Sequence, residues 1–490
     1  MGLNYRTIFR AFGAAVFIVG AAMFIPALVS LFFNEYAVSG GFTVCAVIIT
    51  GAAALVVKLT GSRLRFEMKP RDAIAAVTLC WFASSLLGAA PYMVCGVTYS
   101  AADAFFESAS GFTTTGATCF AELEDLPRGI LLWRSLTGWL GGLEIIALTL
   151  GILPVYASNQ LSVQFESSVL LSERYLPKSG GISRLFYTIY FGFTILLSIC
   201  YLFGGMNFFD ALTHSMGVVS TSGFSNYDIG ASSFNSGFIN WITSAAMLFA
   251  AMNFTLYYRL FTGRRRLILK DEELRSYLAL FACTSVLIAV SLISTNAADA
   301  SNTPVQDLEL AVFEAAATLS TTGMRNADYT LWPPFCQMIL LSLMAAGGCS
   351  ASPAGGLKIV RGLIVFKLIR RNISRRLHPN AFVSIKLDGK PVPSDVSAAV
   401  AGHAMLYASA LLLGTLFVSI GETDHMTAFG SVISCLGNIG SGFSQDGAFA
   451  SYASSPWAIK LFLSFLMIAG RLELTTALLV FTRQFWSNDR

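Results

Sequence analysis

The chain contains 490 residues, of which 55% are hydrophobic and 12% are charged, and its mean hydropathy is +0.65. Soluble domains carry about 25% charged residues, so this composition excludes a soluble globular protein and a disordered chain. The net charge of +4 is too small to indicate nucleic acid as a partner. The composition instead predicts an all-α polytopic membrane protein.

The nine cysteines and four histidines are scattered along the chain, and no CxxC motif or Cys/His cluster appears. The sequence therefore predicts neither a zinc site nor a disulfide framework. It also places no nucleophile beside a general base, so we do not expect an enzyme.

Apolar runs long enough to cross a bilayer, about 20 residues each, recur along the chain. The first begins near Arg6 and Arg10 and is too long for a signal peptide, so we interpret it as a spanning helix. The runs lie near residues 8–33, 38–60, 71–97, 128–154, 184–205, 237–262, 275–295, 332–370 (interrupted), 395–420 and 455–483.

Four shorter apolar segments lie between these runs. Each ends in glycine with small hydroxyl residues and is too short to cross the membrane. Non-helical backbone at membrane depth is tolerated only where it is buried in protein or lines a water-filled cavity. We therefore predict four re-entrant segments, near residues 102–115, 207–222, 305–322 and 425–439.

The basic residues predict the orientation. Of the 32 Lys and Arg residues, 27 fall on one side of the predicted spans, and the other side holds only Arg128, Arg134, Arg325 and Lys460. By the positive-inside rule both termini are cytoplasmic, and the re-entrant segments open to the outside. Acidic residues on that outer side either raise the local cation concentration or form ordinary solvated loops. They are Glu122, Glu124, Asp125, Asp228, Asp328, Glu422, Asp424 and Asp446.

The four re-entrant segments repeat one pattern, with marker glycines separated by 107, 100 and 117 residues. A polar or small residue lies nine positions before each glycine, at Glu107, His214, Glu314 and Ser431. Repeats of this kind imply pseudo-symmetric assembly around one central pore. We predict an N-terminal pair of spans at 1–69, then helix–pore-loop–helix repeats at 70–160, 161–265, 266–385 and 386–490.

Four glycine loops that meet at one axis present a ring of backbone carbonyl oxygens, which replaces the hydration shell of a potassium ion. Glycine supplies the positive φ that such a loop needs, and the C-terminal ends of the half-helices add partial negative charge. The alternative is four ordinary glycine-rich helix hairpins. The predicted ion-binding residues are Thr114, Thr115, Gly116, Thr221, Ser222, Gly223, Thr321, Thr322, Gly323, Asn438, Ile439 and Gly440.

Several motifs together resemble the TrkH/KtrB/HKT superfamily of potassium transporters, and the chain is most similar to the TrkH branch. The resemblance covers essentially the whole chain. In plant relatives a serine at the first filter glycine goes with sodium preference, so Gly116 favours potassium. The motifs are Ser-Gly-Phe-Thr-Thr-Thr-Gly-Ala-Thr (110–118), Gly-Trp-Leu-Gly-Gly (138–142), Ser-Thr-Ser-Gly-Phe-Ser (220–225), Ser-Thr-Thr-Gly-Met (320–324), Gly-Gly-Cys (347–349), Gly-Gly-Leu-Lys (355–358) and Gly-Arg-Leu-Glu (470–473).

The resemblance also implies an assembly: a homodimer with one pore per protomer, in the bacterial cytoplasmic membrane, with a cytosolic ring of TrkA-type nucleotide-binding subunits. The chain itself has no GxxxxGK[ST] and no GxGxxG that opens a helix, so NAD or ATP is expected only on the partner. The segments 259–275 and 358–390 hold 15 basic residues, which suit membrane lipid or an acidic partner surface.

Residues 345–356 cannot form a regular helix, because Pro353 removes a hydrogen-bond donor and four glycines loosen the rest. The resemblance implies that this segment is the intramembrane gating loop, and a simple helix kink is the alternative. The family usually has Ser-Thr-Gly-Gly-Gly where this chain has Ser-Pro-Ala-Gly-Gly at 352–356. The predicted gate residues are Gly347, Gly348, Cys349, Ser350, Ala351, Ser352, Pro353, Ala354, Gly355 and Gly356.

Arg471 lies in the middle of the last predicted span, where a charge costs roughly 2.5–3.5 kcal/mol on insertion scales. The resemblance gives it a role in the gate, and an ion pair with Glu473 or Glu144 is the alternative. Two functions remain open on this scaffold. One is channel-like potassium uptake gated by the cytosolic partner, and the other is potassium symport coupled to sodium or protons.

Overall fold

The computed structural model describes residues 3–61, 70–151, 180–261, 263, 265–295, 303–380, 383–421, 424–443, 447–449 and 451–486. The predicted boundaries at 69 and at 160–161, and the acidic residues Glu422 and Asp446, lie outside these ranges. Six described helices are long and apolar enough to cross a membrane, or up to eight if two bent pairs are counted as spans. Within the described ranges one short hairpin, β1 (Lys386–Leu387) with β2 (Lys390–Pro391), accompanies the helices.

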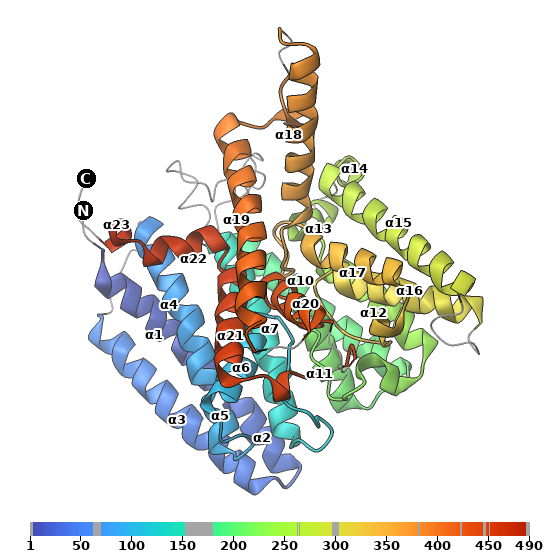
Figure 1. The fold of residues 1–490 in the computed structure, drawn as a ribbon. Helices are drawn as coiled ribbons and strands as arrows, with labels where there is room; N and C mark the ends of the chain where they lie inside the picture. The colour runs from blue at the N-terminus through green and yellow to red at the C-terminus, as the bar shows by residue number, and fades with distance from the viewer. Residues whose placement is uncertain are drawn as a thin grey trace.

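The N-terminal helices form a hairpin against the first repeat (Figure 1). They are α1 (Tyr5–Ala22), α2 (Phe24–Phe32) and α3 (Tyr36–Leu59). A side chain at Gly20 would lie within 3 Å of Thr50, so the glycine permits close packing of α1 on α3. Glu35 accepts hydrogen bonds from the backbone N–H groups of Arg128 (2.7 Å) and Gly129 (3.1 Å). This contact ties the hairpin to the first turn of α7 (Arg128–Gly151).

Four repeats follow, and each contains a helix, a half-helix, a loop and a second helix. The first repeat contains α4 (Pro70–Gly88), α5 (Ala90–Val94), α6 (Ala101–Phe112) and α7. The second contains α10 (Gly180–Phe203), α11 (Phe208–Val219), η1 (Gly230–Phe234), α12 (Gly237–Ala250), α13 (Phe254–Phe261) and α14 (Arg265–Ile268).

The third and fourth repeats have the same order. The third contains α15 (Glu272–Thr295), α16 (Pro304–Leu319), η2 (Tyr329–Leu331), α17 (Pro334–Ala346) and α18 (Ile359–Leu377). The fourth contains α19 (Ser394–Val418), α20 (His425–Gly437), η3 (Tyr452–Ser454), α21 (Trp457–Arg471), α22 (Leu474–Phe481) and α23 (Arg483–Trp486). This architecture confirms the fold class predicted from the sequence.

The half-helices α6, α11, α16 and α20 begin in the same way, because each starts at a side chain that accepts a hydrogen bond from the third residue of the helix. The four caps are Ser100, Asn207, Thr303 and Asp424, which are residue types that stabilise helix N-termini by about 1 kcal/mol. The half-helices contain 12, 12, 16 and 13 residues respectively. The third is therefore about one turn longer than the others.

The predicted continuous spans at 237–262 and 455–483 are wrong, because each is broken. Helices α12 and α13 meet at 92°, and α21 and α22 meet at 111°. At the first break the side chain of Asn253 accepts the backbone N–H of Thr255 (2.9 Å) and starts a new helix. At the second, Glu473 has a φ of 63°, which an α-helix does not continue.

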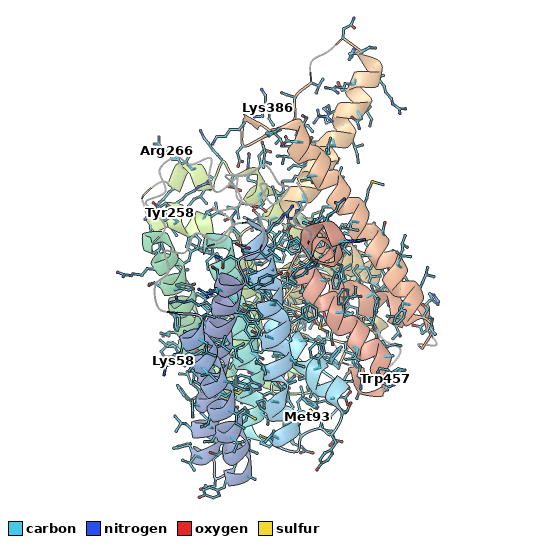
Figure 2. All side chains as sticks on the ribbon, turned by 90° about the vertical axis from the view of Figure 1, so that its left-hand side faces the viewer. Lys58, Met93, Tyr258, Arg266, Lys386 and Trp457 are labelled. Carbon is cyan, nitrogen blue, oxygen red and sulfur yellow. The ribbon has the colours of Figure 1, made fainter. Side chains whose placement is uncertain are left out.

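Two basic residues labelled in Figure 2 lie toward the same end of the bundle. Figure 2 shows Arg266 and Lys386 toward one end, and Met93 and Trp457 toward the opposite end. We call the end with Arg266 and Lys386 the basic face. Helix α18 extends beyond the rest of the bundle on this side (Figure 1). Ile8 of α1 and Phe485 of α23 are buried in one apolar cluster, so the first and last helices pack together.

Candidate functional site: a ring of four glycine loops

The loop after each half-helix has the same backbone geometry in all four repeats. A residue other than glycine adopts a positive φ, and a glycine with a positive φ follows two positions later. The first residues are Thr114 (53°), Thr221 (57°), Thr321 (55°) and Asn438 (53°). The glycines are Gly116 (79°), Gly223 (62°), Gly323 (65°) and Gly440 (89°). β-Branched threonine is rare in this region, so three of the four loops contain strained backbone.

The four loops form a closed ring, as the surroundings of the glycines demonstrate. A Cβ atom at each glycine would collide with a backbone carbonyl oxygen of the next loop. The distances would be 1.7 Å from Gly116 to Ser222, 1.9 Å from Gly223 to Thr322, 1.7 Å from Gly323 to Ile439 and 2.1 Å from Gly440 to Thr115. The order of contacts runs from repeat 1 through repeats 2, 3 and 4 and back to repeat 1.

Backbone hydrogen bonds fix the direction of each loop. The N–H groups of Ser222 and Gly223 both donate to the carbonyl of Gly217, at 2.9 and 3.0 Å, in the last turn of the half-helix. Equivalent bonds join Thr115 to Ser110 (2.8 Å), Thr322 to Ala317 (3.0 Å) and Ile439 to Ser434 (2.9 Å). Where these bonds form, the backbone N–H groups of the predicted ion-binding residues point toward the half-helix of their own repeat.

Hydroxyl groups support the ring from behind. The Oγ1 atoms of Thr113 and Thr115 lie 2.8 Å apart, and the same pairing joins Ser320 to Thr322 at 2.7 Å. The amide of Asn438 donates to the Oγ1 of Thr115 at 3.0 Å and so links the fourth loop to the first. The structure thus brings all of the predicted ion-binding residues together.

The segment from Gly347 to Gly356 contacts two of the four loops. The N–H of Gly355 donates to the Oγ1 of Thr321 at 2.7 Å, and a Cβ atom at Gly355 would lie 2.1 Å from the carbonyl oxygen of Gly437. Its other residues dock at the break between α12 and α13. There the N–H of Cys349 donates to Ala251 (3.0 Å), and the carbonyl of Ala351 accepts from Phe254. The segment is therefore a folded loop, and the simple kink is excluded.

Two charged residues that the sequence reasoning missed hold this loop. The carboxylate of Glu273 accepts the backbone N–H of Ser350 at 2.6 Å and its hydroxyl at 2.7 Å. The ammonium group of Lys358 donates to the carbonyls of Ala354 (2.6 Å) and Ser352 (3.4 Å). A backbone φ of 72° at Lys358 turns the chain into α18. The sequence signal that could have identified Glu273 is an acidic residue in the first turn of a spanning helix, α15.

Arg471 is the last residue of α21 and lies beside the fourth loop. A Cβ atom at the adjacent Gly470 would lie 2.2 Å from the carbonyl oxygen of Leu436. Of the two acids considered as its partners, Glu473 accepts a 2.5 Å hydrogen bond from Arg361 of α18. Arg361 also lies 3.3 Å from the Nε2 of His403. This partly buried cluster joins α18, α19 and the break after α21.

A bundle of membrane-length helices around a closed ring of four re-entrant loops defines a pore-loop type of membrane transport protein. The TrkH family model, described as a cation transport protein, matches residues 42–488. The chain belongs to the TrkH family of cation transport proteins, as the resemblance in its motifs predicted.

Individual relatives cover the whole chain. The Trk system potassium uptake protein TrkH of Halomonas elongata is 32% identical over 489 residues, which is 99% of this chain and 100% of the relative. The protein of the same name from Escherichia coli K12 is 31% identical with the same coverage. The crystal structure of the potassium transporter TrkH from Vibrio parahaemolyticus has a TM-score of 0.87, 29% identity, and coverage of 99% and 100%. Together with the membrane-length helices, these matches identify a multi-pass inner-membrane protein.

Proposed function

We propose that the protein takes up potassium through the ring of four glycine loops. The closed cycle of contacts between each glycine and the next loop carries this proposal, because it surrounds one axis with backbone carbonyl groups. Carbonyl rings bind potassium by replacing its hydration shell. The C-terminal ends of the half-helices lie at the ring and add partial negative charge, which favours a cation. The relatives named as potassium uptake proteins support the choice of ion.

The loop 347–356 is the gate in this proposal. It touches the third and fourth loops of the ring, so an ion that leaves the ring meets it. Lys358 and Arg471 place positive charge near this path, which raises the barrier for a cation while the loop is in place. Conduction therefore requires the loop to move away from Thr321.

The basic face is cytoplasmic in this proposal, with both termini on that side. On this face, α18, α19 and the hairpin of β1 and β2 contact a TrkA-type regulatory ring. NAD or ATP acts only through that partner. The functional unit is a homodimer with one pore in each protomer, and basic residues near 265–275 contact anionic membrane lipid.

The first test is rubidium-86 uptake into liposomes that contain the purified protein and a potassium gradient alone. We expect uptake that disappears when the gradient is dissipated, either directly or after addition of the cytosolic partner. Uptake that appears only with a sodium or proton gradient would contradict channel-like conduction and establish coupled symport.

A further inference from the structure

Two wholly buried glutamates lie behind the ring, at equivalent positions in opposite repeats. Glu107 is 0% exposed and Glu314 is 1% exposed, and each lies nine residues before the glycine of its loop. A buried carboxylate is costly unless hydrogen bonds compensate it. Their partners therefore indicate what these side chains do.

Glu314 binds the segment that leaves the third loop. Its Oε1 accepts the backbone N–H groups of Asn326 at 2.8 Å and Ala327 at 3.1 Å. These residues follow Gly323 by three and four positions. The carboxylate thus joins the half-helix to the outgoing chain, and Gly323 lies on the turn between them.

Glu107 makes the same connection in the first loop. It accepts the hydroxyl of Thr118 at 3.0 Å and the backbone N–H of Cys119 at 3.0 Å. It also forms a 2.6 Å ion pair with Arg134, which is 1% exposed. Arg134 donates in turn to the carbonyl of Ser225 at 3.0 Å, so this connection extends into the second loop.

The second repeat uses a neutral version of the contact. The Nε2 of His214 lies 3.2 Å from the hydroxyl of Ser225, and its Nδ1 lies 2.9 Å from the carbonyl of Asp210. The fourth repeat has the shorter Ser431 at this position. The carboxyl groups thus hold loops 1 and 3, which are not neighbours in the ring and so face each other across its axis.

We propose that Glu107 and Glu314 are positioning residues that set the width of the ring, an inference that rests on the proposed ion path. Each carboxyl group fixes its loop from behind through two donors. Glu107 also forms an ion pair with Arg134, and such charge-assisted bonds are shorter and stronger than neutral ones. The spacing of opposite carbonyl oxygens governs the preference for potassium over sodium where the fit is rigid. Loosening either glutamate therefore relaxes the selectivity without removing any ion ligand.

The test replaces Glu314 with methionine, which has a similar length but no oxygen that accepts the N–H groups of Asn326 and Ala327. Glu309→Met is the matched control, because Glu309 lies on the same helix and binds Asn240 of α12 instead. We measure inhibition of rubidium-86 uptake by external sodium and by external potassium. We expect the potassium-to-sodium preference to fall roughly tenfold or more for Glu314→Met, which leaves both donors unsatisfied, and to stay unchanged for Glu309→Met. An unchanged preference in Glu314→Met would overturn the role of Glu314.

A second pair of variants separates positioning from charge balance. Glu107→Gln leaves Arg134 buried without its carboxylate, whereas Glu107→Gln with Arg134→Gln removes both charges. We expect the double variant to fold and to keep the lowered preference for potassium. Recovery of the wild-type preference in the double variant would show that Glu107 only neutralises Arg134. For variants that do not conduct, the rise of Tm with potassium chloride or sodium chloride reports ion binding.

The same assay distinguishes this inference from the ion path itself. If Gly116→Ser changes the preference and Glu314→Met does not, the ring remains the ion path and the positioning role is refuted. If neither variant changes the preference, both proposals are refuted.

Discussion

The ring depends on single residues that have no room for substitution. At each glycine the next loop occupies the place of a side chain, and three threonines accept left-handed backbone that costs about 1–3 kcal/mol each. Such strain persists only where the surroundings impose it. The hydroxyl of Thr321 also accepts a hydrogen bond from the backbone N–H of Gly355, so a strained ring residue directly contacts the loop 347–356, the proposed gate.

Gly116→Ser tests the ring at this scale. A Cβ atom there would lie 1.7 Å from the carbonyl oxygen of Ser222, so that carbonyl must move outward. We expect sodium to compete more effectively with rubidium-86 uptake, by about tenfold if roughly 1.4 kcal/mol of discrimination is lost. Gly96→Ser is the matched control, because Gly96 also has a positive φ of 74° but its nearest neighbour would lie 3.9 Å away. Equal effects of the two substitutions would contradict the assignment.

At the scale of elements, local sequence predicted the half-helices well. The predicted segments at 102–115 and 425–439 begin within a residue of α6 (Ala101–Phe112) and α20 (His425–Gly437). Apolar residues, capping side chains and a terminal glycine lie within one short stretch in each case. These local signals act without help from distant contacts.

The breaks in α12–α13 and α21–α22 were missed for the opposite reason. The two helices at each break are both apolar, so the hydropathy of the sequence predicts one continuous span. The first break depends on the loop 347–356, which is about 100 residues away in sequence and takes over the backbone groups of Ala251 and Phe254. Lys358 was assigned to the basic cytoplasmic segment, because charge counting cannot show that a side chain folds back onto carbonyls.

Lys358→Met tests the attachment of the gate. The substitution keeps the length of the side chain but removes the ammonium group that donates to Ala354 and Ser352. Hydrogen bonds from charged donors contribute about 1.5–3 kcal/mol, so we expect the loop to open more often and basal rubidium-86 uptake to rise several-fold without any partner. Lys386→Met, on the exposed hairpin of the basic face, is the control. A folded Lys358→Met protein with unchanged or lower basal uptake would refute this role.

At the scale of the whole molecule, one chain must close a ring between its beginning and its end. The side chains of Lys460 on α21 and Asp103 on α6 form a 2.7 Å ion pair across this junction. The backbone N–H of Tyr452 also donates to the carbonyl of Thr118 at 2.8 Å. The fourth repeat is thereby held against the first, although some 350 residues separate them.

Lys460→Met tests this closure. The ammonium group is buried, whereas the side chain of Asp103 is 25% exposed, so the loss of this charged hydrogen bond destabilises the protein by about 1.5–3 kcal/mol. We expect a clear drop in Tm, partly recovered when Asp103→Asn is added. Arg128→Gln is the control, because its contact with Asp210 is 4.0 Å long and its side chain is 43% exposed. Because the arginine is exposed and the contact is long, this pair contributes at most about 1 kcal/mol. If Lys460→Met and Arg128→Gln have equal Tm values, the ion pair does not hold the junction.

The extra turn of α16 has a geometric consequence for the approach to the ring. All four half-helices end at the same ring, so the additional length of α16 extends at its N-terminus, away from the ring. Four residues more than the 12 of α6 raise that end by about 6 Å. The N-terminal end of α16 therefore lies farther from the ring than the N-terminal ends of α6, α11 and α20. In the proposed ion path, the approach to the ring is therefore less symmetric than the ring itself.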